Sequence, residues 1–198
     1  AKRAVPLVRA AYERAAGEEK VTCAILLGAC GDATGAKTLL AELQEAGEWE
    51  ERKPLGVMAE YSELPTRTDA LILALGCCRA PGALSAIVEK VETLGPEVCL
   101  SHHRAVALAL ERYAAPEAAE TLSRLLRRPG MSGYAQETLA MPGSRIEPLR
   151  EIVLARALYR CGDHEAVGET ILRRYTRDLR GHLARHATAV LGGPGHAD

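Results

Sequence analysis

The chain has 198 residues, of which 47% are hydrophobic and 26% are charged, and its formal net charge is −1. Such a composition is that of an ordinary globular protein with one domain or a short repeat array, and the near-zero charge excludes a global field that would steer it to nucleic acid or an acidic membrane. Phe is absent, which argues against an extensive sheet, and no apolar run approaches the ~20 residues of a membrane-spanning helix.

Apolar residues recur at helical spacing along most of the chain. Leu71, Leu75 and Cys78, for example, follow one another at i, i+4 and i+7. Two longer segments, 47–66 and 129–147, contain Gly and Pro at positions that break helices, and we expect loops there. The spacing predicts about ten helices, at residues 4–16, 19–30, 33–46, 67–79, 82–94, 102–114, 116–128, 148–161, 164–177 and 180–191.

The chain also begins within a helical pattern, "AKRAVPLVRAAYERA", without a Met. This beginning favours a fragment of a longer protein, so the lack of a signal peptide says little about where the parent resides.

Four segments of the chain resemble one another. Each contains the end of one apolar helix, a turn of two to four residues with Gly, Asp, Ala or Pro, and a second amphipathic helix. They align on Leu27, Leu75, Leu110 and Leu158, at offsets of 48, 35 and 48 residues. Two neighbouring units sum to 83 residues, and this period places the two long loops at equivalent positions, so both should emerge from one edge. A single helix pair cannot bury its apolar stripe, whereas stacked pairs can, and the repeat therefore predicts an all-α solenoid.

The stretch "GDATGAKTLLAEL" nearly spells a phosphate-binding P-loop, G-x-x-x-x-G-K-[ST]. However, Ala36 separates Gly35 from Lys37, and the preceding "KVTCAILLGAC" has a helical rather than a strand pattern. A P-loop needs a preceding strand and a glycine cradle next to its lysine. We interpret Gly31 and Asp32 as a turn between two helices, with no nucleotide or other cofactor bound there.

The repeated pattern A-L-G-x-x-G-D-x-x-A-x-x-x-L is carried best by "LLGACGDATGAKTLLAEL" and "ALYRCGDHEAVGETIL". It resembles HEAT repeats of the short type also seen in phycobilisome-lyase-like proteins. The resemblance implies a right-handed α-α superhelix with two inserted loops, forming a single domain over 1–192 with a flexible tail at 193–198. Its repeat units would be about 18–46, 67–94, 102–128 and 148–177, with a terminal helix at 180–191.

A narrower likeness concerns the second half of the chain. The stretches "SHHRAVALALE", "RRPGMSGYA" and "DLRGHLARHATAVL" are similar to the helical C-terminal region attached to some bacterial FAD-dependent oxidoreductases. This likeness implies that a catalytic module belongs to a longer parent, since no G-x-G-x-x-G fingerprint occurs in these residues.

The six cysteines form no C-x-x-C pair. Most lie on apolar faces of predicted helices, where cysteine usually acts as a small buried hydrophobe, so a reducing, cytoplasm-like environment is favoured over a disulfide scaffold.

Histidines provide the first candidate site. His182 and His186 are four residues apart on one predicted helix, and His102 and His103 open another beside Cys99. Two histidines on one face supply half of a zinc site, but zinc usually needs three or four ligands. We therefore favour histidines that cap helices and line a ridge, and assign no metal ligand.

A polar ridge is the second candidate, as a strip that binds an anion or a protein partner. A solvated helix face explains the same residues equally well. The ridge comprises Arg104, Arg180, His182, Arg185 and His186.

The two loops are the third candidate. The first carries Trp49 and Tyr61, and the second carries Tyr134. Loops on a rigid scaffold often provide aromatic anchors for recognition, but these side chains can equally fold back over the core.

The sequence shows no constellation of catalytic residues, because it lacks G-x-S-x-G, H-E-x-x-H and G-x-G-x-x-G. We therefore expect a noncatalytic scaffold or protein-interaction domain. The alternatives are a nucleic-acid-binding or base-processing module, which the charge balance disfavours, and a metal-dependent hydrolase that uses the histidine ridge.

Overall fold

The computed structural model describes residues 3–51, 65–139 and 145–193, and over these ranges it contains helices and turns but no strand. Its ten α-helices confirm the number and order expected from the apolar spacing. They are α1 (Val5–Arg14), α2 (Gly17–Ala29), α3 (Ala36–Glu45), α4 (Arg67–Cys78), α5 (Ala83–Val91), α6 (Leu100–Tyr113), α7 (Pro116–Leu126), α8 (Ile146–Arg160), α9 (Val167–Tyr175) and α10 (Gly181–Leu191). Two short 3-10 helices, η1 (Ala33–Gly35) and η3 (His164–Ala166), precede α3 and α9.

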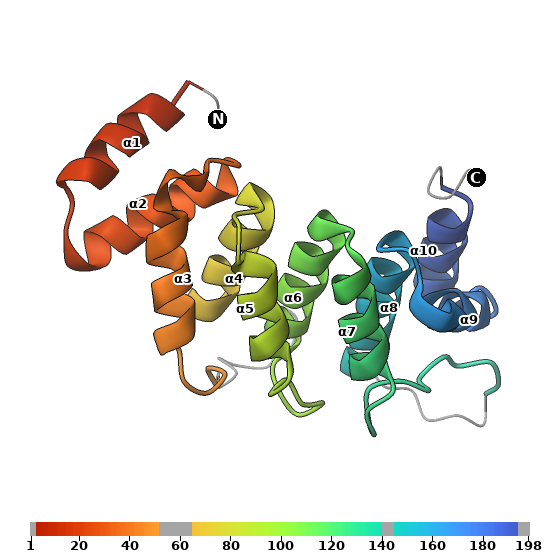
Figure 1. Cartoon of the computed structure of the whole chain (residues 1–198). Coiled ribbons are helices and arrows are strands. Elements are labelled where there is room, and N and C mark those ends of the chain that lie inside the picture. The colour runs from red at the N-terminus through yellow and green to blue at the C-terminus, as the bar shows by residue number, and fades with distance from the viewer. Residues whose placement is uncertain (1–2, 52–64, 140–144, 194–198) are drawn as a thin grey trace.

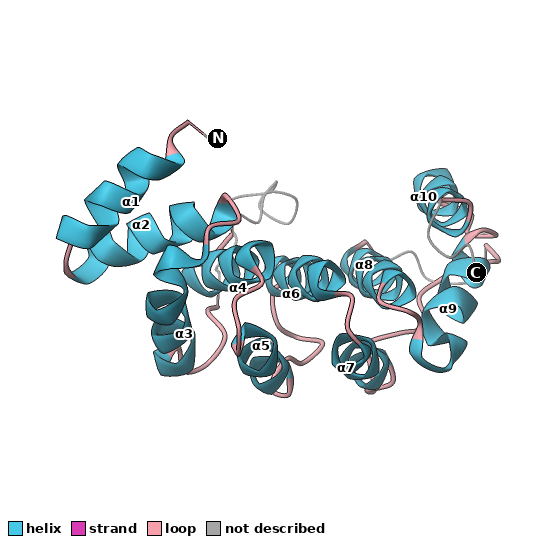
Figure 2. Cartoon of the chain, turned by 45° about the horizontal axis from the view of Figure 1, so that its top comes forward, coloured by secondary structure: helices cyan, strands magenta, loops and turns pink. Residues whose placement is uncertain are grey.

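Helices α2 to α8 and α10 lie in two layers, while α1 packs on α2 and α9 packs on α8 and α10. One row contains α2, α4, α6, α8 and α10, and α3, α5 and α7 lie along one side of it (Figure 1). Within the row, α4 packs between α2 and α6, and α6 packs between α4 and α8. Figure 2 shows that the row follows a shallow arc, with α3, α5 and α7 on its outer side. The inner side of the row is therefore not covered by these three helices.

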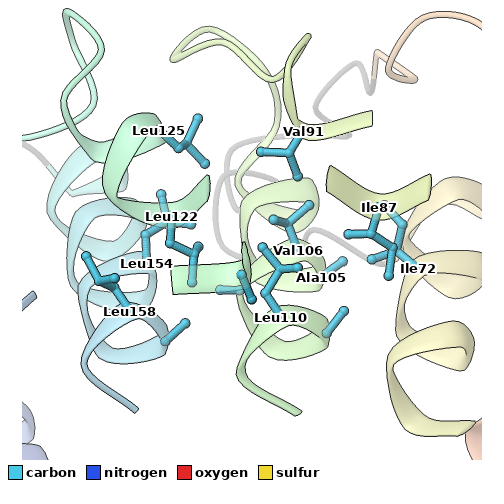
Figure 3. Packing of buried hydrophobic residues seen from close by; sticks show 14 of the residues in the cluster. Ile72, Ile87, Val91, Ala105, Val106, Leu110, Leu122, Leu125, Leu154 and Leu158 are labelled. Carbon is cyan, nitrogen blue, oxygen red and sulfur yellow. The ribbon is translucent and has the colours of Figure 1, made fainter. Parts of the chain in front are cut away.

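Apolar side chains fill the space between the two layers. Figure 3 shows Ile72, Val106 and Leu154 from the row close to Ile87 and Leu122 from the outer helices. All five are 0% exposed. Complete burial of one such side chain contributes roughly 1.5–3 kcal/mol, so this interface stabilises the stacking of each pair on the next.

The leucines on which the four segments align occupy equivalent places in the fold. Leu27, Leu75, Leu110 and Leu158 lie near the C-terminal ends of α2, α4, α6 and α8, and each is at most 1% exposed. The alignment therefore identified one repeated core position.

Small residues let neighbouring helices of the row approach closely. A Cβ atom on Gly28 would lie 2.8 Å from Cβ of Ala74, and one on Gly76 would lie 2.6 Å from Cα of Ala109. Such contacts are too short for a side chain at either glycine. The α2/α4 and α4/α6 interfaces thus each depend on a missing methyl group.

Polar side chains cap several helices where the sequence suggested turns. Asp32 accepts a hydrogen bond from the backbone N of Thr34 at 2.8 Å, in the turn between α2 and α3 that carries the P-loop-like stretch. Asp163 accepts bonds from the backbone N of Gly168 and of Glu169, both at 2.7 Å. These carboxylates satisfy donors that the first turn of a helix leaves unpaired.

Some helix boundaries differ from the predicted ones. Helix α6 begins at Leu100 rather than at residue 102, because Cys99 takes the N-cap position. Helix α5 begins at Ala83 rather than at residue 82, because Gly82 has a left-handed φ of 78° and takes the N-cap position. Within the described ranges two of the six cysteines, Cys23 and Cys161, are buried, fewer than expected.

The described parts of the two long loops, 46–51 and 127–139, lie at the same edge of the molecule, at the bottom of Figure 1. This agrees with the position that the 83-residue period predicts. None of the helices in the described ranges is long and apolar enough to cross a membrane.

Candidate functional site

A buried ion pair between His102 and Asp69 lies inside the edge of the molecule from which the two long loops emerge. His102 is 0% exposed; its Nδ1 lies 2.6 Å from Oδ1 of Asp69 and its Nε2 lies 3.0 Å from the carbonyl O of Glu50. Because both ring nitrogens face acceptors, the imidazolium form can donate to both. Burial opposes the charge on His102, but the hydrogen bond to Asp69 raises the pKa of the ring above its ordinary value. Burial likewise opposes the charge on Asp69, whose pKa the same bond lowers.

The adjacent histidine is also buried. Nδ1 of His103 lies 3.0 Å from the carbonyl O of Cys99, and Nε2 lies 3.1 Å from that of Gly95. Burial, aided by the positive charge of Arg150, lowers the pKa of His103 to about 4, so the ring is neutral at pH 7. Both histidines of α6 thus face the interior, and each is 0% exposed.

Trp49 folds back onto the core. Its side chain is 9% exposed, its ring centroid lies 4.9 Å from that of His102, and its Nε1 donates to Oγ1 of Thr93 at 3.0 Å. Nζ of Lys90 lies 5.0 Å from the indole ring. Trp49 therefore covers the core, as one of the two interpretations of the loop aromatics expected, and does not project into solvent as a recognition anchor would. Beside it lies a cleft of about 480 Å³, lined by Gly47, Glu48, Trp49, Glu50, Glu51, Thr93, Glu97, Val98 and Cys99.

The first loop is fastened to the helix that follows it. Oε1 of Glu50 accepts a hydrogen bond from the backbone N of Thr68 at 3.1 Å. Burial would raise the pKa of Glu50, but hydrogen bonds from Thr66 and Thr68 lower it, so the carboxylate is charged. Together with the bond from His102, this contact holds the described part of the loop against α4 and α6. Tyr61 lies outside the described residues.

The second loop is held by a buried carboxylate. Glu151 is 2% exposed and accepts hydrogen bonds from the backbone N of Gly133, the backbone N of Tyr134 and the hydroxyl of Tyr175, each at 2.8 Å. Arg150, 3% exposed, donates to the carbonyl O of Gly130 at 2.6 Å. The loop backbone is thus bound on two sides by α8.

Arg180 belongs to this loop rather than to a surface ridge. Its Nη2 donates to the carbonyl O of Tyr134 and to Oδ2 of Asp178, both at 2.6 Å. Burial would raise the pKa of Asp178, but hydrogen bonds from Arg180 and from the backbone of Gln136 lower it. The structure therefore brings together two of the predicted residues, Tyr134 and Arg180, as parts of a loop anchor.

The histidines of α10 lie at the C-terminal end of the row, with α8 between them and α6 (Figure 1). His182 and Arg185 are exposed, and His186 is half-buried. Burial, followed by the charges of Arg156 and Arg160 on α8, lowers the pKa of His186. Within residues 3–51, 65–139 and 145–193, no group of three or more His, Cys, Asp or Glu side chains is arranged to hold a metal ion.

One exposed stripe runs along each of three neighbouring helices of the row. Helix α6 is flanked by α4 and α8 and contacts α5 and α7, so its exposed residues face away from the outer layer (Figure 2). The same holds for the partly exposed stripes of α4 and α8. We call this surface the inner face, and it consists of Ala70, Leu73, Cys77, Arg104, Leu108, Glu111, Arg112, Leu149, Val153, Arg156 and Arg160.

The inner face is positively charged. Its four arginines and one glutamate sum to +3, in a chain whose net charge is −1. Glu111 accepts from Nε of Arg156 at 3.1 Å and from Nη1 of Arg160 at 2.5 Å. Among the described residues, neither Arg104 nor Arg112 has an ion-pair or hydrogen-bond partner. Two guanidinium groups on α6 are therefore free to bind a ligand.

Of the residues predicted to form a polar ridge, only Arg104 lies on the inner face. Leu108 and Arg112, which lie beside it on α6, were not predicted as contact residues. The signal was present, because Arg104, Leu108 and Arg112 are four residues apart and share one side of α6. Leu108 is 37% exposed, although leucine is most often a core residue.

Comparison of the chain with protein-family models, with curated proteins and with solved structures found no match of any kind. The features that bear on function are therefore those of the chain itself: two fastened loops, a buried polar interior at the loop edge, and an exposed inner face of arginine and aliphatic residues.

Proposed function

We propose that this chain is a noncatalytic helical-repeat domain of the HEAT type, a right-handed α-α superhelix that binds a protein partner on its inner face. The partner is either a separate protein or the catalytic module of a longer parent chain. The repeat assignment is supported by the four aligned leucines, which are buried at equivalent places in α2, α4, α6 and α8.

The observation that carries the proposal is the exposure of aliphatic side chains on three adjacent helices. Leu108 is 37% exposed on α6, while Leu73 on α4 and Val153 on α8 are partly exposed. Leu73 and Val153 also pack against the core and present only part of their side chains to solvent, whereas Leu108 is the most exposed of the three. A cluster of aliphatic residues surrounded by arginine is typical of a surface that binds protein.

The rest of the structure supports a role in presentation. Buried hydrogen bonds fasten the described parts of both loops, and fully buried leucines hold the helices together. A surface on packed helices keeps its shape in the free state, so little conformational entropy is lost on binding.

A photo-crosslinking experiment tests the proposal. A benzophenone amino acid replaces Leu108 on the inner face or, as the matched control, exposed Lys37 on α3 of the outer layer. Irradiation in extract of the source cells should yield a discrete adduct at position 108 and none at position 37, and the purified partner should bind the unmodified chain in solution. Adducts of equal yield at both positions, or a partner captured only through position 37, would contradict the proposal.

A further inference from the structure

The charge of the inner face indicates the chemistry of its partner. Arg156 and Arg160 share Glu111, whereas Arg104 and Arg112 have no partner among the described residues. The half-buried ring of His186 on α10 lies close to these arginines, since burial and the charges of Arg156 and Arg160 lower its pKa. A ligand that complements this surface carries carboxylates.

The aliphatic residues indicate a second property. Leu73, Leu108 and Val153 come from three successive helices of the row, so they cross the inner face from one helix to the next. A purely polar anion would cover them without any favourable burial, whereas apolar side chains on the ligand would remove them from water.

The backbone of the inner face limits the conformation of the ligand. This surface consists of helices, whose interior N–H and C=O groups are already paired, so an extended segment would find no backbone partners there. A helix satisfies its own backbone and presents apolar residues at i, i+3, i+4 and i+7 on one side.

We propose that the inner face binds an acidic amphipathic helix of a protein partner. Its apolar side contacts Leu73, Leu108 and Val153, and its carboxylates pair with Arg104 and Arg112. This inference rests on the proposed function and adds the chemical class of the partner to it.

Nucleic acid would also respond to the positive charge, but it fits the surface less well. Phosphates offer nothing to cover Leu108, and none of the inner-face residues is an aromatic on which bases could stack. DNA therefore serves as a competing probe in the test.

The probe is a fluorescein-labelled peptide with Leu at i, i+3, i+4 and i+7 and Glu at the other exposed positions. Its length is about 20 residues, which spans roughly 30 Å, the width of three helices packed about 10 Å apart. Fluorescence anisotropy measures its binding to the whole chain at about 50 mM and 500 mM NaCl. A peptide with Lys in place of Glu and a DNA duplex of similar length are measured in parallel.

We expect the Glu peptide to bind more tightly than the Lys peptide or the DNA, and more weakly at the higher salt concentration. The Arg104→Glu/Arg112→Glu variant should weaken its binding by about tenfold or more. Lys37→Glu on the outer layer makes the same kind of charge reversal and should leave binding unchanged within about twofold. Circular dichroism checks that the variants fold, since all three positions are exposed.

Two results would overturn the inference. One is a Glu peptide that binds no better than the Lys peptide, and the other is DNA that binds most tightly and is the ligand lost on charge reversal. If a partner crosslinked through position 108 keeps its affinity in the Arg104→Glu/Arg112→Glu variant, the acidic-helix inference fails while the proposed function stands. If no partner is captured through position 108, the proposed function itself fails.

Discussion

Replacement of Asp69 by Asn should lower the free energy of unfolding in a pH-dependent way. Asp69 is 1% exposed; its Oδ1 lies 2.6 Å from Nδ1 of His102, and its Oδ2 accepts from the backbone N of Thr66 at 2.9 Å. Asparagine keeps the size of the side chain and an oxygen for the capping bond. It removes both the negative charge and the acceptor oxygen that face the buried imidazolium, so the change tests the contact between Asp69 and His102.

The magnitude follows from the burial of both partners. A hydrogen bond to a charged group contributes about 1.5–3 kcal/mol, and removal of one partner from a buried ion pair costs up to about 3–5 kcal/mol. Because the one oxygen of Asn keeps the capping bond, its amide group faces His102 and the bond from the imidazolium is lost, so we expect Asp69→Asn to cost about 2–3 kcal/mol where both groups are charged.

The pH window follows from the two pKa shifts. The pKa of Asp69 is lowered from 3.8, so its stabilising contribution is present above 3.8 and is lost as the pH falls through the lowered value. The pKa of His102 is raised from 6.5, so its contribution is present below 6.5 and is lost as the pH rises through the raised value. The difference between the wild-type chain and the variant should therefore be largest between about pH 4 and pH 6.5 and decline as the pH rises through the raised pKa of His102.

Urea unfolding at about pH 5.5 and pH 9.5, followed by circular dichroism, measures this difference. Glu120→Gln on α7 is the matched control, because it also neutralises a carboxylate but its side chain is 54% exposed; it should change the free energy of unfolding by at most about 0.5 kcal/mol at either pH. A difference for Asp69→Asn that is equal at both pH values, or larger at the higher one, would refute the assignment of a charged His102–Asp69 pair.

Two further substitutions test the packing. Leu110→Ala removes a side chain that is 0% exposed and should lower the free energy of unfolding by about 2–5 kcal/mol. Leu108→Ala, at a position that is 37% exposed, should change it by at most about 0.5 kcal/mol. Similar losses for the two variants in urea unfolding would contradict the division of α6 into a buried side and an inner face. Gly76→Ala places a Cβ atom 2.6 Å from Cα of Ala109, so it should lower the free energy of unfolding by about 1–3 kcal/mol and with it the midpoint of thermal unfolding. Gly47→Ala is the control, because a Cβ atom there has no neighbour within 4 Å and should leave the midpoint unchanged. A Gly76→Ala variant as stable as the wild-type chain would show that α4 and α6 are farther apart than described.

The helices could be predicted because their signals are local. The spacing of apolar residues depends on which side of each helix packs, and the burial of Leu27, Leu75, Leu110 and Leu158 shows that the alignment found a true core position. Helix ends were less accurate, because they depend on single residues such as Gly82, whose left-handed backbone delays the start of α5.

The polar sites could not be predicted in the same way, because they depend on contacts between distant parts of the chain. His102 meets Asp69, which is 33 residues away, and the carbonyl of Glu50, which is 52 residues away. Nothing in the spacing of His102 and His103 distinguishes a buried ion pair from a surface ridge. Arg180 likewise looks like a surface cation until Asp178 and the backbone of Tyr134 are placed beside it.

The residue that follows each aligned leucine in the sequence differs between the helix–helix contacts of the row. It is Gly28 in α2 and Gly76 in α4, but Glu111 in α6, where the carboxylate reaches Arg156 and Arg160 of α8. Contacts between a glycine and an alanine are insensitive to ionic strength, whereas partly hydrated ion pairs weaken as salt is added. Raised salt should therefore weaken the ion pairs of Glu111 between α6 and α8, and the Arg67–Glu18 pair between α2 and α4, while the glycine–alanine contacts keep the helices of the row together.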